Sequence, residues 1–416
     1  MLLSNICLVS NIIFLAFYPS NGASLKKVIV VFRHGDRSPI GTYKNDPYIT
    51  EEYWPQGLLQ LTQKGMYQEY NLGKFLKKRY MMNENLLNST YKKSEIFVES
   101  TDTDRTLMSA QSVLNGLYPP VGNQIWRKGL DWQPIPVHTT TYDLILGDYE
   151  CKALADAISE TRKSKNFTET TKMYKKFINK INTNTGENYK TIEDISPFCD
   201  NAFCNSQHNN TLKWLSHEEL EKCTDFVPAY DGWFQRGSEK KAKYGLGFFF
   251  ANMSELFHNA KDHKIQRKLT LFSAHDTTII SFFYGLGAKF VAQPTYSSAV
   301  MTELWQDKNE WQIKLAYRTL SKDGKEIVKP VKVKGCSNSE FCSFDEFMKI
   351  IDKVKLTRDE YNDACVETEV KKLSVATIIA IVASIIICLL ASFLVLSWLR
   401  RKSSPTPFYT AIHRGS

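Results

Sequence analysis

Three clusters of polar residues in this sequence have the side chains needed to bind an anion and attack it. The first, Arg33-His34-Gly35-Asp36-Arg37, directly follows the apolar residues 28–32. Arginine presents forked N–H donors that match the oxygens of a phosphate. The two flanking cations should lower the pKa of His34 and keep its imidazole neutral and nucleophilic. Gly35 should let the backbone come close to a ligand. Taken alone, Arg-His-Gly is more often a basic loop around a structural histidine.

The second and third clusters repeat the same arrangement of a strand, a polar group and the start of a helix. Arg105 falls in the first turn of a predicted helix after the strand 95–100, and His275-Asp276 lies between the strand 268–274 and another helix. Alone, Arg105 would be a surface arginine and His275-Asp276 a helix cap. Helix N-termini attract anions, and ligands of open α/β sheets bind at the carboxyl ends of the strands. Together, the clusters predict a phosphate site with these members: His34 as nucleophile, Arg33, Arg37, Arg105 and His275 as phosphate ligands, and Asp276 as the carboxyl group.

These clusters require a sheet to position them. Residues 28–32 are apolar without alternation, which is typical of a strand buried on both faces. We predict an α/β fold with a central, mostly parallel sheet flanked by helices, built from residues 24–150 and 244–350. Thr62 should cap a helix that runs to Tyr80, and Asp102 or Thr103 should cap the next helix. Residues 151–243 are polar and helix-prone and predict a smaller helical cap domain.

Longer patterns around the clusters resemble the histidine acid phosphatases. They are Arg33-His-Gly-x-Arg-x-Pro39, Leu61-Thr-x-x-Gly-x-x-Gln68, Ser100-Thr-Asp-x-Asp-Arg-Thr106 and Thr302-Glu-Leu304, and the resemblance extends over residues 25 to 366. It implies a phosphoglycerate-mutase-like fold, a cap over the site, a phosphorylated His34 and Arg105 as a third phosphate-binding arginine. Within the family, the lysosomal type, akin to its prostatic secreted type, is the most similar.

The predicted chemistry is hydrolysis of phosphate monoesters through a phosphohistidine. Phosphoryl transfer requires mainly positioning and charge stabilisation. His34 attacks phosphorus, Asp276 protonates the leaving oxygen, and water then releases phosphate. No Asp/His cluster has metal-ligand spacing, so we expect a metal-free mechanism without a cofactor. An aspartic acid has an ordinary pKa of about 3.9, which favours an acidic optimum.

Two apolar segments predict a membrane protein with a lumenal or extracellular body. Residues 1–23 resemble a cleaved signal peptide, and residues 373–399 are long enough to span a bilayer. The basic residues at 400–402 predict a cytosolic tail, 400–416, after a stem, 351–372. Tyr409 and Ile412 have the spacing of an endocytic and lysosomal sorting signal. A type I protein of lysosomes, endosomes or the plasma membrane should be glycosylated at the sequons, which begin at Asn88, Asn166, Asn209 and Asn252.

The cysteines support the same oxidising compartment. Seven of the nine cysteines lie between the two apolar segments, so at least one thiol should be free or paired between chains. Cys336 and Cys342 flank a short loop and should pair, and Cys151 and Cys365 resemble the long-range bridge of the family. Cys204 matches one partner of the remaining family bridge, but residues 298–300 contain no cysteine. Either Cys204 or Cys199 then pairs with Cys223.

Charge and composition restrict the partners. The net charge is +9, but the last 17 residues hold +4 of it, so the body is only mildly basic and does not have a nucleic-acid-binding profile. We expect a phosphomonoester as the substrate. Candidate protein partners are a second copy of the chain and a sorting adaptor that binds the tail. Alternative functions are a phytase-like or lipid-phosphate phosphatase, or a non-catalytic membrane glycoprotein or sorting receptor that keeps the fold.

Overall fold

The computed structural model describes residues 22–139, 147, 150–264, 267–288, 292–337, 340–366 and 369–402. The described residues up to Cys365 belong to one compact unit, and those from Val366 onward belong to a second. The structure does not describe residues 1–21 of the predicted signal peptide, Tyr409 or Ile412, so the signal peptide and the sorting signal stay predictions.

The centre of the first unit is a mixed sheet. In the part of the chain that the structure describes, the strands follow the order β2-β3-β1-β4-β5-β6, and β7 pairs with β5. Their bounds are β1 Ser24–Arg33, β2 Ile96–Ser100, β3 Leu269–Ala274, β4 Ala299–Asp307, β5 Glu310–Leu320, β6 Glu326–Pro330 and β7 Cys342–Ser343. Only β2, β3 and β1 are parallel to one another, and every other pairing is antiparallel.

The prediction of a mostly parallel sheet therefore holds for the three strands that precede the polar clusters and not for the rest. Asp307 pairs with Glu310, so only two residues connect β4 to β5. A connection of that length permits an antiparallel hairpin, whereas a parallel pair needs a crossover of a dozen or more residues.

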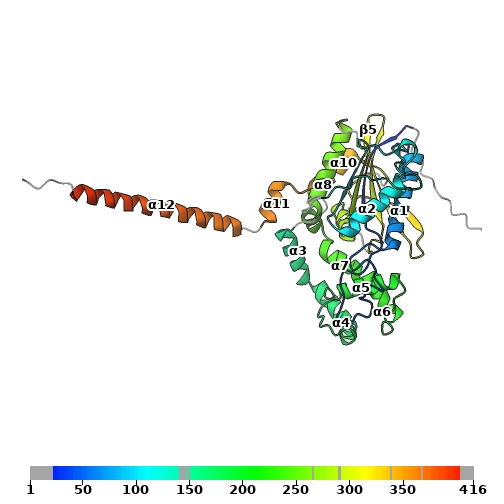
Figure 1. The fold of residues 1–416 in the computed structure, drawn as a ribbon, viewed down its shortest axis with the longest axis horizontal. Coiled ribbons are helices and arrows are strands. Elements are labelled where there is room, and N and C mark those ends of the chain that lie inside the picture. The colour runs from blue at the N-terminus through cyan, green and yellow to red at the C-terminus, as the bar shows by residue number, and fades with distance from the viewer. Residues whose placement is uncertain are drawn as a thin grey trace, which may run out of the picture. The chain divides into compact units, whose positions relative to one another are not determined.

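Helices cover both faces of the sheet, which explains the unbroken apolar run in β1. Val28, Val30 and Phe32 pack on the face covered by α1 and α2, and Ile29 and Val31 pack on the face covered by α8, α9 and α10. Figure 1 shows α1 and α2 on one side of the sheet and α8 and α10 on the other. The helices are α1 Gln63–Lys77, α2 Asp104–Leu117, α8 Glu239–Lys261, α9 Asp276–Gly285 and α10 Phe344–Val354.

The first two helices begin near their predicted positions and cross at glycines. Thr62 caps α1 by accepting a bond from the backbone N–H of Gly65, as predicted. Thr103 occupies the N-cap position of α2, but its side chain makes no capping bond, so that part of the prediction is wrong. A Cβ on Gly73 would lie 2.1 Å from the carbonyl oxygen of Val113, which is why α1 can pack this close to α2.

Residues 151–243 form helices, as expected, and these gather at one end of the unit in Figure 1. The helices have an apolar cluster of their own, in which Phe177, Ile181, Phe198 and Val227 are buried. The elements are α3 Lys152–Arg162, α4 Lys165–Thr185, α5 Ser196–Gln207, α6 His217–Glu221, a π-helical turn at Lys222–Phe226 and α7 Val227–Arg236. We call this group the cap.

Disulfides connect distant and local parts of the unit. The predicted bridges Cys151–Cys365 and Cys336–Cys342 are both present. The third bridge joins Cys199 to Cys223 inside the cap, which decides between the two alternatives and leaves Cys204 as a buried free thiol.

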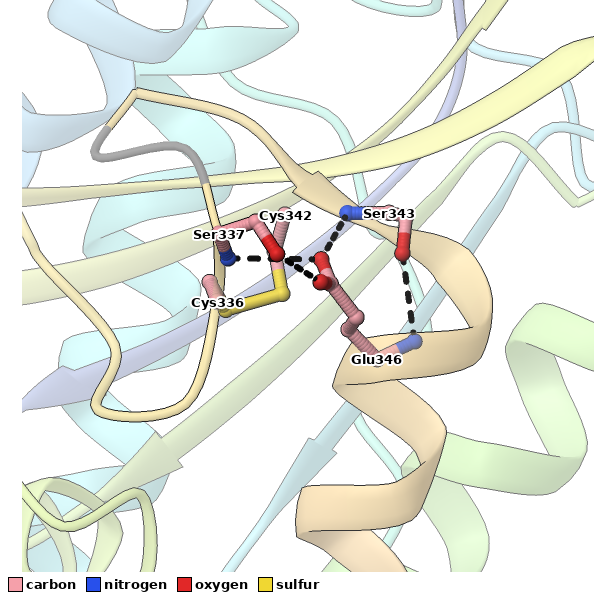
Figure 2. The surroundings of a disulfide bond; sticks show 5 residues. All are labelled: Cys336, Ser337, Cys342, Ser343 and Glu346. Atoms are coloured by element: carbon pink, nitrogen blue, oxygen red, sulfur yellow. Dashed lines mark hydrogen bonds between the residues drawn. A yellow bond between two sulfur atoms is a disulfide. The ribbon is translucent and has the colours of Figure 1, made fainter.

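The Cys336–Cys342 bridge lies beside the start of α10. Figure 2 shows Ser343 and Glu346 in a reciprocal capping box, in which each side chain accepts from the backbone N–H of the other residue at 3.3 Å. Glu346 also accepts hydrogen bonds from Ser337, next to the bridge. The disulfide and this capping box therefore fix the first turn of α10 together.

The segment after α10 is folded up to Cys365. Ile351, Val354 and Leu356 are buried, and α11 follows at Arg358–Ala364. The predicted stem, 351–372, therefore begins too early, because its apolar residues pack into the first unit.

The second unit contains one long helix, α12 (Glu369–Lys402). Within it, Thr377–Arg400 has 24 residues and a mean hydropathy of 3.1, and none of this stretch is buried. At about 1.5 Å per residue, this stretch is long enough for a bilayer core of about 30 Å. Its length and composition agree with the predicted membrane span.

Candidate active site

The three polar clusters meet because β1, β2 and β3 end in register. Arg33 lies opposite Ala274 on β3, and Ser100 lies opposite Ser273. The backbone N–H of His34 donates to the Ala274 carbonyl at 3.0 Å. The carboxyl ends of three parallel strands therefore bring all six predicted residues to one edge of the sheet.

His34 is buried and has one nitrogen free to react. Its Nδ1 lies 2.8 Å from the carbonyl oxygen of Gly35, which can only accept, so Nδ1 carries the proton and Nε2 keeps its lone pair. The pKa of His34 is well below its ordinary value, first because the ring is buried and then because Arg33, Arg37, His275 and Arg105 are close. Like-charge repulsion, predicted from the sequence, is thus the smaller cause. The His275 ring centroid is 5.7 Å away.

Gly35 has a packing role that the sequence did not indicate. A Cβ at this position would lie 2.4 Å from the backbone oxygen of Gly65, at the start of α1. The glycine is needed because the loop after β1 packs directly on the first turn of α1. The predicted close approach of this backbone to a ligand stays a prediction.

Arg33, next to His34 in the chain, forms an ion pair with the predicted acid. Its Nη2 lies 2.8 Å from Asp276 Oδ2, and its Nη1 donates to the Pro294 carbonyl at 2.5 Å. The guanidinium also lies over the ring of Tyr296, 4.3 Å from its centroid. These contacts hold the guanidinium in one orientation.

Arg37 is held by the cap. Its Nη2 and Nη1 donate to the two carboxylate oxygens of Asp200, on α5, at 2.7 and 3.0 Å. Asp200 also accepts from the backbone N–H of Ile40. No sequence pattern indicates a role for Asp200, because this residue lies in the polar cap segment and not at a strand end.

Arg105 completes the group of arginines from the first turn of α2. Burial and the charges of Arg37 and Arg33 lower its pKa to about 10, against the opposing effect of Asp276, so Arg105 stays cationic at neutral and acidic pH. Within the described part of the chain, the Nε atoms of Arg33, Arg37 and Arg105 are all buried without a hydrogen-bond partner. A buried donor without an acceptor costs about 1–3 kcal/mol, so the site is built for an acceptor that it does not itself provide.

His275 and Asp276 begin α9, as predicted. His275 Nε2 lies 3.0 Å from Thr101 Oγ1, and burial together with the nearby Arg105 lowers the pKa of His275. Asp276 accepts from Gln293 at 2.6 Å and from the backbone N–H of Thr277 at 2.8 Å. Burial raises the pKa of Asp276, but Arg33, Arg37 and His275 together outweigh it, and the pKa lies below its ordinary value.

A cavity of about 510 Å³ contains all six residues. The cap contributes much of the remaining wall, mainly through α5 and α7. A second polar contact joins the cap to the loop after β1, because His208 Nε2 lies 2.6 Å from the buried Asp36 carboxylate. The same carboxylate accepts a hydrogen bond from the Thr62 hydroxyl. The loop that carries His34 and Arg37 is therefore fixed by the cap on one side and by α1 on the other.

The four sequons are placed unequally. Asn166 and Asn209 are exposed, whereas Asn88 and Asn252 are half-buried, and the Asn88 side chain donates to Glu95. Exposed side chains suit glycosylation, so Asn166 and Asn209 are the better candidates, and all four stay predictions.

Known proteins resemble this chain in both sequence and fold. The model of the histidine phosphatase superfamily (branch 2) matches residues 24–318. Prostatic acid phosphatase of Mus musculus is 36% identical over 344 residues, which cover 81% of this chain and 88% of the relative. Lysosomal acid phosphatase of Homo sapiens is 31% identical over 407 residues, which cover 95% and 93% of the two chains.

Among solved structures, a Hafnia alvei phytase in complex with tartrate superposes with a TM-score of 0.63 at 14% identity and covers 81% of this chain and 98% of its own. At that identity the likeness shows the fold alone. The family match and the identity to the two acid phosphatases support phosphatase activity. The chain belongs to branch 2 of the histidine phosphatase superfamily and is a phosphatase.

Proposed function

We propose that this protein hydrolyses phosphate monoesters at acidic pH through a phosphohistidine on His34. The observation that supports this most strongly is one cavity lined by a neutral buried histidine and three arginines whose Nε donors lack acceptors. A tetrahedral phosphoryl group presents several oxygens and can accept from all three arginines.

In the first step, the Nε2 lone pair of His34 forms a bond to phosphorus while the phosphorus–oxygen ester bond breaks. Arg33, Arg37, Arg105 and His275 bind the equatorial oxygens and stabilise their charge. The electron pair of the broken bond stays on the leaving oxygen, and Asp276 gives it a proton.

In the second step, water attacks phosphorus and the phosphorus–nitrogen bond breaks. Asp276, now ionised, accepts the proton of the attacking water, and inorganic phosphate leaves. His34 regains its lone pair, and Nδ1 keeps its proton and donates it in a hydrogen bond to the Gly35 carbonyl throughout. This bond fixes the ring, so that the same nitrogen faces phosphorus in both steps.

The acidic optimum follows from a count of protons. The pKa of Asp276 lies below its ordinary value in the free protein, so the carboxyl is ionised at mildly acidic pH. The reactive complex needs one proton for the leaving oxygen, and a phosphomonoester with a second pKa of about 6 brings that proton as a monoanion and passes it to the Asp276 carboxylate, which then gives it to the leaving oxygen. Catalysis should therefore be favoured below the second pKa of the substrate.

The lumenal or extracellular placement is part of the proposal. Support comes from the apolar stretch in α12, from the three disulfides and from the lysosomal relative. Protease treatment of intact vesicles should remove an epitope tag at Ser416 and spare the body, and a protected tag would contradict type I topology. Tyr409→Ala should raise surface biotinylation if the tail carries a sorting signal.

The decisive test of the activity is phosphate release by the purified full-length protein in detergent, with several phosphomonoesters across a pH series. We expect turnover with an acidic optimum. A protein that binds these esters but releases no phosphate at any pH would support the non-catalytic glycoprotein instead.

A further inference from the structure

The cavity has two chemically distinct parts. The inner part contains His34 and the arginines and is reserved for the phosphoryl group. The outer part is formed mainly by the cap, and the alcohol portion of a substrate must occupy it, because Asp276 places the leaving oxygen between the two parts. The charges of the outer part therefore select the alcohol.

The outer part offers no cation to a second anionic group. Within the described lining of the cavity, the only arginines are the three of the phosphoryl site, and there is no lysine. The lining instead contains four carboxylates, Glu193, Asp200, Asp231 and Asp276. A second phosphate or a carboxylate on the alcohol would face these anions without a counter-charge.

Three of the four carboxylates are already paired. Asp276 contacts Arg33, Asp200 contacts Arg37, and Glu193 accepts from Arg162 at 2.6 and 2.8 Å. Asp231, on α7, has no ion pair among the described residues.

The Asp231 carboxylate can also accept at least one further hydrogen bond. It accepts from the side-chain amide of Gln235 at 3.0 and 3.1 Å and from Ser196. A carboxylate offers about four lone-pair sites, so at least one stays open. Asp231 is thus the one unpaired charge in the described lining outside the phosphoryl site.

Asp231 lines the same cavity as the predicted acid, Asp276. α7 packs against α9, and a Cβ on Gly232 would lie 2.5 Å from the Ile280 side chain. Burial raises the pKa of Asp231, and the charges of Asp276 and Glu193 raise it further, against the hydrogen bonds from Gln235 and Ser196, so a cation bound beside Asp231 would favour its ionised form. A cationic group a few bonds from the leaving oxygen would meet Asp231.

We infer that this phosphatase prefers monoesters whose alcohol carries a protonated amine a short chain away from the ester oxygen, with Asp231 as the residue that recognises the amine. The inference rests on the proposed function and adds a substrate class to it. A charge-assisted hydrogen bond between an ammonium group and a partly buried carboxylate stabilises the complex, whereas a second anion is repelled.

Competitive inhibition by matched phosphonates tests this inference without the differences in leaving-group reactivity. The probes are 3-aminopropylphosphonate, 3-hydroxypropylphosphonate and 3-phosphonopropanoate, which carry a cation, a neutral group and an anion at similar distances from phosphorus. Each inhibition constant is measured against nitrophenyl phosphate hydrolysis by the full-length protein. We expect the amine to bind about tenfold more tightly than the hydroxyl compound, since bonds to charged groups have this strength, and the carboxylate to bind most weakly.

Asp231→Asn should reduce the amine-to-hydroxyl preference to within about twofold. Glu193→Gln is the matched control, because its carboxylate is already occupied by Arg162, and it should keep the preference. Equal inhibition constants for the amine and the hydroxyl compound in the wild-type protein would overturn the inference even if Asp231→Asn did not fold. A preference unchanged in a folded Asp231→Asn would also overturn it. A wild-type protein with no turnover of nitrophenyl phosphate would instead refute the proposed function itself.

Discussion

Replacement of Asp276 by asparagine should affect substrates according to their leaving groups. In the proposed mechanism, the carboxyl group protonates the departing oxygen, a role typically worth about 10²- to 10⁴-fold in rate, or about 2.7–5.4 kcal/mol. Nitrophenolate departs without that proton, whereas a glycerol alkoxide does not. The asparagine variant should therefore keep most of its phosphoenzyme formation with nitrophenyl phosphate and lose it with glycerol phosphate.

The structure indicates that the variant keeps its binding site. Arg33 loses one partner but stays bonded to the Pro294 carbonyl and stacked on Tyr296, and the Thr277 N–H can still donate to the asparagine oxygen. The loss of the charged partner should cost about 1–3 kcal/mol of unfolding free energy. Asp345→Asn, which also changes an aspartate in the first turn of a helix but at an exposed position away from the site, is the control.

Single-turnover kinetics measures the first step separately from dephosphorylation, in which Asp276 also takes part. We expect the rate ratio of the two substrates to change by at least about 100-fold between wild type and Asp276→Asn. If both substrates slow by the same factor in that step, Asp276 is not the general acid.

Three further predictions concern pH, packing and the cap. The fall of kcat/KM at alkaline pH should follow the second pKa of each phosphomonoester, because Asp276 is already ionised in the free protein. If kcat/KM falls at the same pH for esters with different second pKa values, this prediction is wrong. Gly73→Ala should lower the unfolding free energy by about 1–3 kcal/mol in urea denaturation, since the new methyl group meets a backbone carbonyl of α2, whereas Gly41→Ala, with nothing within 4 Å, should not. Asp200→Asn should lower the inhibition constant of inorganic phosphate severalfold, because the anion that competes for Arg37 becomes neutral; weaker inhibition would show that Asp200 mainly positions the arginine.

The site residues that directly follow a strand could be predicted from the sequence. Each strand of the parallel part is a short apolar segment followed at once by polar residues and a helix start, and the carboxyl ends of neighbouring parallel strands meet at one edge. His34, Arg105 and Asp276 come together for that reason. The prediction of a mostly parallel sheet fails for the antiparallel half, although the two-residue connection between Asp307 and Glu310 is typical of a hairpin.

Contacts made by the cap could not be predicted. Asp200 and Asp231 lie in a polar helical segment whose placement over the sheet depends on tertiary packing, and neither has a spacing that indicates a role. Cys199 and Cys204 both lie on α5, and only the arrangement of the cap decides that Cys199 faces Cys223. Burial of the Cys204 thiol raises its pKa to about 12, which agrees with a structural position and not a reactive one.

The most direct test of the central claim is identification of the phosphorylated residue. The wild-type protein is mixed with radiolabelled nitrophenyl phosphate, quenched within one turnover, and digested under alkaline conditions that preserve a phosphorus–nitrogen bond. We predict an acid-labile label on the peptide that contains His34, and no label in His34→Ala. A label on another residue, or steady turnover by a folded His34→Ala, would contradict the mechanism.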